Sequence, residues 1–448
     1  MSPQLRFRAA VARALQGVPP VRLVLLGYAA CVVVGWTLLS LPVAQAVAGT
    51  SALDHLFTAA SAVSTTGLVT VSPSGAYSGF GELVILLFIQ IGGIGYMSLG
   101  SFIVLSRGRR LSRSRERLLA ADFSMPRSFR LEEFVRGVVV FTAVAETLGA
   151  LALWALFSAA GVERALYQAV FHSVSAFCTA GFSLFDTSLE AFADNPGVNF
   201  VVAALAYLGA VGFIVAVDVW RVWTGEQPRL TTTSRIILRL TALLTVAGTV
   251  GVFLVEGDAL PGPPALRWLA AFFQAMTAMT TVGFNTVPIG GLTQGGLLLV
   301  ILLMVVGASP SGTGGGVKTT TLSAIYAVVR SVLRGDEAVT YRGRPVPTDR
   351  VLAAVASFAF YVAVLLVGLV ALTLTERADF LVLAFEAASA LGTVGLSMGV
   401  TGDLTALGKL VVIGLMFAGR LGPLSFGSAL FLRDRDAPVV EDEVEVVL

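Results

Sequence analysis

The sequence predicts an all-α polytopic membrane protein built from four parallel repeats around one pore. Three observations predict this fold class. Of the 448 residues, 56% are hydrophobic and only 13% are charged, which is about half the charged share of a soluble domain. Long stretches, such as 23–53 and 83–106, contain no charged residue. A short motif also recurs four times along the chain.

Eight membrane spans are expected, because about 20 apolar residues cross a bilayer. Only the third inner span is expected to be interrupted. Four other apolar segments are too short to cross the bilayer and are predicted to be re-entrant helices. The alternative is that they are hydrophobic loops. The spans are 23–45, 83–105, 136–158, 198–220, 236–255, 292–333 (interrupted), 351–375 and 407–432. The short segments lie near 53–64, 165–178, 266–280 and 380–392.

Each short segment ends in the pattern [ST]-A-x-x-T-x-G-[LF]. The four copies begin at Ser61, Ser175, Thr277 and Ser389. The chain therefore divides into repeats of outer span, re-entrant helix, Thr-x-Gly turn and inner span. All four enter from one side, which predicts pseudo-fourfold symmetry about an axis along the membrane normal. The predicted boundaries are 1–120, 121–230, 231–345 and 346–448.

Most basic residues fall in the two termini or in segments that follow even-numbered spans, such as the arginines of 107–117. This bias predicts a protein of the cytoplasmic membrane with both termini in the cytoplasm. The four short helices then face the outside, where acidic residues such as Asp186 and Asp403 are in excess.

The four Thr-x-Gly turns are candidates for an ion selectivity filter. A cation that leaves water needs oxygen atoms to replace its hydration shell, and glycine lets successive carbonyls point one way. A single Thr-x-Gly would be read as a helix C-cap, but four matched copies favour a filter. The candidate K⁺-binding residues are Ser64, Thr65, Thr66 and Gly67; Cys178, Thr179, Ala180 and Gly181; Thr280, Thr281, Val282 and Gly283; and Gly392, Thr393, Val394 and Gly395.

The third inner span contains a stretch of Pro, Ser and Gly at 308–317, followed by Lys318. Such residues do not sustain a helix. They predict a loop that blocks the pore beneath the filter; a kink needed only for packing is the alternative. Arg420, at the matching place in the fourth inner span, is expected to hold the loop closed, or else to cap broken helix carbonyls. The candidate gate residues are Ser311, Gly312, Thr313, Gly314, Gly315, Gly316, Lys318 and Arg420.

Three stretches, 177–183, 281–285 and 392–397, are close to the filter motifs of the TrkH/KtrB/HKT superfamily of potassium transporters. The sequence resembles that superfamily over nearly its whole length, and its eight spans resemble KtrB most. The resemblance implies an ion-translocating subunit for K⁺ uptake with an intramembrane gating loop at 308–317. It also implies a homodimer on a cytosolic KtrA/TrkA-like ring that binds ATP, ADP or NAD.

Several alternatives stay open. Each loop has one Gly where the potassium-channel filter TVGYG has two. A Na⁺-selective or mixed Na⁺/K⁺ protein of the same superfamily is therefore the nearest alternative to a K⁺-selective one. The sequence does not decide between a channel and a symporter mechanism. Parallel repeats argue against an alternating-access transporter. Two His and two Cys argue against an enzyme. We expect no prosthetic group, nucleotide only through a partner, lipid as surroundings and no nucleic-acid partner.

A few other residues have alternative roles. His172 and Glu386 could attract cations at the pore mouth or pack behind the filter, and packing is favoured for His172. Glu146 could couple a proton, but a helix–helix hydrogen bond is favoured. The acidic tail 441–448 could pack at a subunit interface or on a partner. Gly209 and Gly212 of the second inner span are expected to permit close helix packing near the pore.

Overall fold

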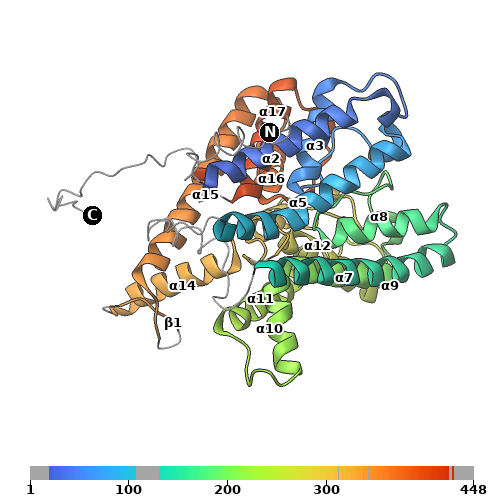
Figure 1. Cartoon of the computed structure of the whole chain (residues 1–448). Helices are drawn as coiled ribbons and strands as arrows, with labels where there is room; N and C mark the ends of the chain where they lie inside the picture. The colour runs from blue at the N-terminus through green and yellow to red at the C-terminus, as the bar shows by residue number, and fades with distance from the viewer. Residues whose placement is uncertain are drawn as a thin grey trace, which may run out of the picture.

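The computed structural model describes residues 20–106, 131–310, 312–336, 338–341, 344–422 and 426–427. Ser311, the arginines of 107–117 and the acidic tail 441–448 lie outside the described residues. Within these ranges the chain is helical except for loops and one hairpin, in which β1 (Thr340–Tyr341) pairs with β2 (Arg344–Pro345). The helices gather around a common centre (Figure 1), and the predicted all-α fold class is confirmed.

Four long outer helices surround the molecule. They are α2 (Pro20–Leu39), α7 (Leu131–Ala159), α11 (Thr232–Glu256) and α15 (Thr348–Thr375). By length and composition these four can each cross a membrane. Large apolar side chains such as Leu254 and Leu374 are exposed on them, as expected of a surface that faces lipid.

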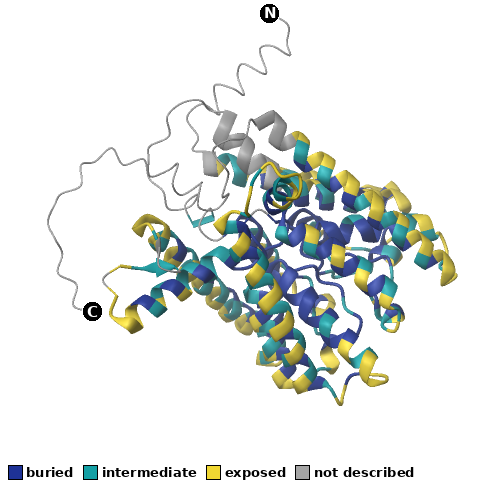
Figure 2. Ribbon diagram, turned by 90° about the horizontal axis from the view of Figure 1, so that it is seen from below, coloured by how far each residue is buried: buried dark blue, intermediate teal, exposed yellow. Residues whose placement is uncertain are grey.

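Four short helices lie inside the ring of outer helices. They are α3 (Ala52–Ser64), α8 (Ala165–Phe177), α12 (Pro264–Thr280) and α16 (Phe380–Gly392). Their inner ends are completely buried (Figure 2). The predicted re-entrant segments are therefore helices, and the alternative of hydrophobic loops is wrong. We call these four the pore helices.

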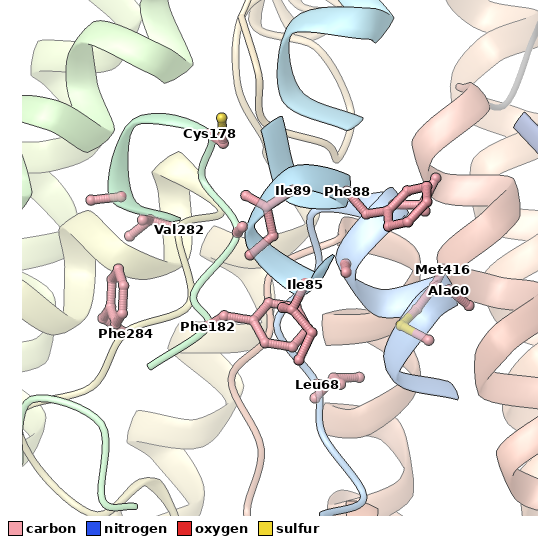
Figure 3. Close-up of a cluster of buried hydrophobic side chains, with 14 of the residues drawn as sticks. Ala60, Leu68, Ile85, Phe88, Ile89, Cys178, Phe182, Val282, Phe284 and Met416 are labelled. Atoms are coloured by element: carbon pink, nitrogen blue, oxygen red, sulfur yellow. The ribbon is translucent and has the colours of Figure 1, made fainter. Parts of the chain in front are cut away.

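The pore helices share their packing as well as their motif. Each buries a phenylalanine four residues before the first residue of the motif, at Phe57, Phe171, Phe273 and Phe385, and none of the four is exposed. The residue after each motif glycine is buried too, at Leu68, Phe182, Phe284 and Leu396. Figure 3 shows Leu68 and Phe182 near Ile85 of α5, with Phe284 farther away. Equivalent positions thus fill equivalent places in the core.

The inner helices are the least regular part of the fold. They are α5 (Gly79–Ser106), α9 (Pro196–Val211), α13 (Gln294–Val305) and α17 (Ala406–Leu421). After α13 the chain is not helical until α14 (Thr319–Arg334), which agrees with the predicted interruption. Shorter elements are η1 (Pro42–Ala44), α4 (Pro73–Ala76), η2 (Glu190–Phe192), η3 (Ile289–Gly291) and η4 (Thr401–Asp403).

The expectation that only the third inner span is broken is wrong. The second inner helix ends at Val211, and α10 (Phe213–Trp223) departs from it at 96°. Gly212 lies between them with φ of 82°, a conformation that favours glycine. It therefore ends a helix rather than permitting helix packing. If the bent pair is one span, five of the described helices and pairs can cross a membrane.

The bend at Gly212 has a tertiary cause. The amide of Thr313 donates to Gly209 O at 2.9 Å, and that of Ser309 donates to Ala210 O at 3.1 Å. The Ser309 hydroxyl donates to Val211 O at 2.7 Å. The 308–317 segment thus satisfies the last carbonyls of α9, which are orphaned at any helix end.

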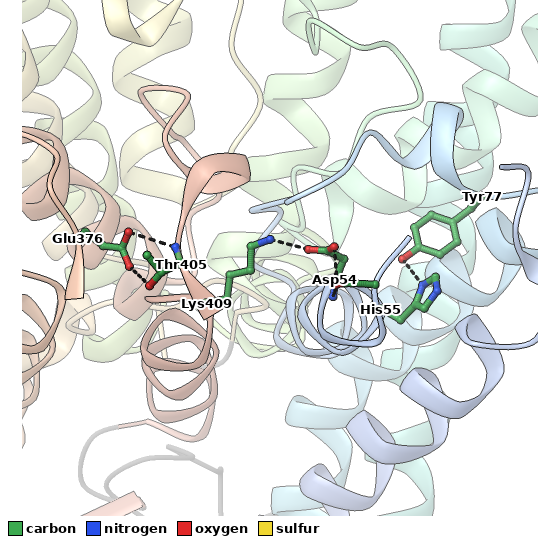
Figure 4. A network of polar contacts seen from close by, with 7 residues as sticks. Asp54, His55, Tyr77, Glu376, Thr405 and Lys409 are labelled. Atoms are coloured by element: carbon green, nitrogen blue, oxygen red, sulfur yellow. Dashed lines mark hydrogen bonds and ion pairs between the residues drawn. The ribbon is translucent and has the colours of Figure 1, made fainter. Parts of the chain in front are cut away.

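The first and last repeats meet at an ion pair. Lys409 at the start of α17 donates to Asp54 at the start of α3, with Nζ and Oδ1 2.8 Å apart and both side chains largely buried (Figure 4). Nearby, Glu376 at the end of α15 accepts hydrogen bonds from the amide and hydroxyl of Thr405. The Asp54–Lys409 pair joins the last repeat to the first, where no peptide link does, and the Glu376 contacts fix the start of α17 within the last repeat.

Candidate functional site

Each pore helix ends in the same unusual backbone turn. The threonine of the motif has positive φ in all four repeats, at Thr65 (50°), Thr179 (50°), Thr281 (59°) and Thr393 (49°). A β-branched residue rarely adopts this left-handed conformation. Its amide donates to the carbonyl three residues earlier, and the next amide donates to the carbonyl five residues earlier, in every repeat. The four turns are thus equivalent in hydrogen bonding as well as in sequence.

The motif glycines follow two residues later, again with positive φ: 95° at Gly67, 65° at Gly181, 84° at Gly283 and 95° at Gly395. Each is pressed against the backbone of the next repeat. A Cβ atom on it would approach a carbonyl oxygen of that repeat far inside contact distance. The added Cβ atom would lie 2.4 Å from Ala180 O at Gly67 and 2.5 Å from Val282 O at Gly181. It would lie 2.0 Å from Val394 O at Gly283 and 2.1 Å from Thr66 O at Gly395.

These four approaches form a closed ring, because the fourth repeat leads back to the first. The ring brings together the carbonyl-bearing residues Thr66, Ala180, Val282 and Val394. No side chain larger than hydrogen fits at the four glycines, so the backbones of neighbouring repeats are in direct contact at this level. A ring of backbone carbonyls can replace the water around a dehydrated cation.

The first motif residue supports the turn from behind, but not in the same way in each repeat. The hydroxyls of Ser61 and Ser389 accept from the amides of Gly67 and Gly395, both at 3.1 Å. The hydroxyl of Ser175 instead donates to Phe182 O at 2.8 Å. The Thr277 hydroxyl has no hydrogen-bond partner among the described residues. The ring is therefore pseudo-symmetric rather than symmetric.

Directly beneath the ring lies the 308–317 segment, which we call the intramembrane loop. It folds back on itself: Gly307 N donates to Val317 O at 3.0 Å, and Ala308 N donates to Gly315 O at 3.1 Å. Its described residues are buried. Backbone without helix at this depth needs such partners, because lipid offers none.

The intramembrane loop touches the side chains of three of the four motif threonines. Gly315 N donates to Thr281 Oγ1 at 3.0 Å. The hydroxyls of Thr179 and Thr313 are 3.1 Å apart. A Cβ atom on Gly315 would lie 2.3 Å from Thr393 Oγ1. The loop thus fills the space immediately below the carbonyl ring.

Two cationic side chains hold the intramembrane loop by its carbonyls. Lys318 Nζ donates to Gly314 O at 2.6 Å. Arg420 on α17 is buried, and its guanidinium donates to Thr313 O of the loop and to Gly92 O of α5. Arg420 therefore connects the fourth repeat, the first repeat and the loop. The described gate residues all lie together at this place.

Sequence reasoning missed one feature of the site. Ser309 was part of a helix-breaking stretch, yet its amide and hydroxyl hold the end of α9. The half-buried Glu146 of α7 accepts a hydrogen bond from Gln90 of α5 at 3.1 Å, which agrees with the helix–helix hydrogen bond expected of it. Cys178 of the second motif turn lies 3.5 Å from Gln90 Oε1 and 3.8 Å from a Glu146 oxygen.

Comparison with known proteins gives a consistent result. The profile of the TrkH family, described as cation transport protein, matches residues 30–432. The chain is similar to Ktr system potassium uptake protein B of Vibrio alginolyticus, with 36% identity over 91% of this chain and 90% of the relative. It is also similar to potassium/sodium uptake protein NtpJ of Enterococcus hirae, with 31% identity over 92% of this chain and 93% of the relative.

Among solved structures, the potassium transporter TrkH from Vibrio parahaemolyticus has a similar fold. The TM-score is 0.71 and the sequence identity is 20%, and the alignment covers 92% of this chain and 84% of that one. At this identity the likeness bears on the fold alone.

Proposed function

This chain belongs to the TrkH family of cation transport proteins, and on that premise we propose that it is the ion-translocating subunit of a potassium uptake system. The family is one of transporters, so the chain is not an enzyme. The observation that carries the proposal is the closed ring formed by Gly67, Gly181, Gly283 and Gly395 against neighbouring carbonyls. K⁺ passes through that ring down its electrochemical gradient.

K⁺ is favoured over Na⁺ as the main substrate. The Ktr relative is named for potassium uptake, and NtpJ is named for potassium and sodium. A mixed Na⁺/K⁺ member is the second candidate, supported by NtpJ and by the single glycine in each filter turn.

The intramembrane loop is the gate of this proposal, and the described arrangement is the closed one. The loop lies against Thr179, Thr281 and Thr393, so an ion that leaves the ring inward would meet it at once. Arg420 and Lys318 hold it through the carbonyls of Thr313 and Gly314. Their positive charges also oppose a cation at this level. Gly312, Gly315 and Gly316 supply the backbone freedom needed for the loop to move.

A cytosolic partner then controls the gate. We expect a KtrA/TrkA-like ring that binds ATP, ADP or NAD, beneath a homodimer of this chain in the cytoplasmic membrane with cytoplasmic termini. The name of the Ktr relatives, each part of a system, supports a partner. Since α14 begins at Thr319, directly after the loop, a partner that displaced α14 would pull on the gate.

The decisive experiment is growth of a K⁺-uptake-deficient bacterium at micromolar K⁺. The chain is expressed with and without a Ktr-type cytosolic subunit, and with and without Na⁺ in the medium. Rescue at low K⁺ without Na⁺ is the expected result. Rescue only with Na⁺ would favour the mixed member, and no rescue under any condition, with the protein present in the membrane, would contradict K⁺ uptake.

A further inference from the structure

Behind the carbonyl ring, each pore helix carries one buried polar side chain at the same position. It lies three residues before the first motif residue, and it differs in every repeat: Thr58, His172, Gln274 and Glu386. All four side chains are completely buried. A buried polar group is costly unless it is hydrogen-bonded, so the partners of His172, Gln274 and Glu386 indicate what the position does. The Thr58 hydroxyl of the first repeat has no hydrogen-bond partner among the described residues.

In the fourth repeat the partner is the segment that follows the filter glycine. Ser397 Oγ accepts from Gly399 N at 3.0 Å, so its own proton is free to go to Glu386 Oε2 at 2.9 Å. The Thr401 hydroxyl donates to the other carboxylate oxygen. Both oxygens of Glu386 are therefore within hydrogen-bond distance of a hydroxyl group of this segment.

The second repeat has the same arrangement, with the imidazole of His172 in place of the carboxyl group of Glu386. Ser183 Oγ accepts from Phe185 N at 2.9 Å and lies 2.9 Å from His172 Nε2. The other ring nitrogen of His172 is 2.7 Å from Gln168 O, which can only accept. Nδ1 therefore carries the proton, and Nε2 is the acceptor of a neutral imidazole.

The third repeat has a weaker version. Gln274 Nε2 donates to Thr286 Oγ1 at 3.3 Å, and Gln274 Oε1 has no partner among the described residues. Three repeats thus hold the outgoing filter segment through a hydroxyl, and only the fourth does so with an acidic side chain.

We propose that Glu386 is a positioning residue that sets the cation affinity and selectivity of the ring. Its carboxyl group fixes the segment between Gly395 and Thr401 through two hydroxyl groups. When ionised, it places a negative charge behind the fourth filter turn, at a buried position where charge interactions are weakly screened. This inference rests on the proposed filter function. Glu146, near Cys178, is the corresponding acidic group behind the second turn, and Arg420 is the opposing cation below.

Glu386→Gln is the test variant, because an amide keeps the size and can still bond both hydroxyls, as Gln274 bonds Thr286. Gln274→Glu adds the charge at the equivalent position of the third repeat. Glu226→Gln, at an exposed position of the loop after α10, is the matched control for removal of one carboxylate. Each full-length variant is assayed for K⁺ and Na⁺ uptake in the deficient bacterium, and for stabilisation by each cation against heat after purification.

We expect Glu386→Gln to raise the KM for K⁺ by about three- to tenfold while the maximal rate changes less than about twofold, and to reduce the preference for K⁺ over Na⁺. Gln274→Glu should lower the KM, and Glu226→Gln should match the wild type. A purely structural role would reduce the amount of protein or the maximal rate and leave the KM unchanged.

An unchanged KM and K⁺/Na⁺ preference in Glu386→Gln, at normal membrane levels, would overturn the inference. If that variant does not fold, Gln274→Glu decides: a KM equal to or above that of the wild type would overturn it. Absence of saturable K⁺ uptake and of K⁺ stabilisation in the wild type would instead contradict the proposed function.

Discussion

The carbonyl ring and the layer beneath it are built from the same four repeats, but they differ in symmetry. In the ring, Thr65, Thr179, Thr281 and Thr393 have φ values within 10° of one another, and each glycine meets the next repeat in the same way. Beneath it, α9 bends at Gly212, α13 gives way to a loop, and α17 contributes the buried Arg420. A ring of similar carbonyls can surround one ion on the axis, whereas a segment from a single repeat is enough to block a pore.

The strongest way to break the ring is to add one methyl group. Gly283→Ala would place a Cβ atom 2.0 Å from Val394 O at a residue with φ of 84°. We expect K⁺ uptake to fall by about 100-fold or more, because the carbonyl of the neighbouring turn must move. Gly414→Ala in α17 is the control, since a Cβ atom there meets nothing within 4 Å. Equal uptake by the two variants would refute the ring.

The next largest effect concerns the layer beneath. Arg420→Ala removes the donors to Thr313 O and Gly92 O, and hydrogen bonds from a charged group contribute about 1.5–3 kcal/mol each. We expect K⁺ efflux from vesicles without a cytosolic partner to rise about tenfold. Arg420→Lys keeps the charge and should raise it less. Unchanged or lower efflux, with normal protein levels, would contradict a role in holding the gate closed.

A smaller effect is expected from a substitution that removes the hydrogen bonds between the loop and the second motif turn. Thr313→Val keeps the side-chain shape but loses the contacts with Thr179 Oγ1 and Phe177 O, both at 3.1 Å. At about 1 kcal/mol for a neutral hydrogen bond, partner-independent efflux should rise about two- to fivefold. Thr319→Val is the control, because that buried hydroxyl has no partner among the described residues. Equal efflux from the two variants would show that the hydroxyl of Thr313 does not help to hold the loop closed.

The smallest effect is expected at the junction of the last and first repeats. Partial burial acts to raise the pKa of Asp54, but hydrogen bonds from Lys409 and Ser51 and the charge of Lys409 lower it to about 2. The ion pair therefore stabilises the fold fully above the unfolded-state pKa near 4, and that stability is lost as pH falls towards 2.

Asp54→Asn should accordingly lower the thermal midpoint of the purified protein slightly at pH 7, by a contribution of about 1 kcal/mol or less. The difference from the wild type should vanish as the pH falls towards 2. Asp258→Asn is the control, since Asp258 is fully exposed in its contact with Arg267. A difference that persists at pH 2 would show that Asp54 acts otherwise than through its charge.

Much of the fold follows from local sequence. The pore helices lie within two residues of the predicted segments, because each is a short apolar run that ends in Thr-x-Gly. The interruption after α13 follows from clustered Gly and Pro. The boundaries between repeats and the roles of the filter and gate residues remain predictions.

What the sequence did not reveal depends on long-range contacts. Nothing near Gly212 indicates a 96° bend, since the partners of the last carbonyls of α9 come from Ser309 and Thr313, about 100 residues away. Likewise, His172, Gln274 and Glu386 share a position but no chemistry, and only their partners show a common role.

The sequence by itself determined four apolar repeats, their re-entrant helices and the glycines at each turn, because composition, length and backbone freedom are local properties. The tertiary structure decided that the turns close into a ring, that the intramembrane loop lies under Thr179, Thr281 and Thr393, and that Arg420 holds it. Those outcomes depend on which buried donors and acceptors meet, and in a membrane interior each of them needs a partner.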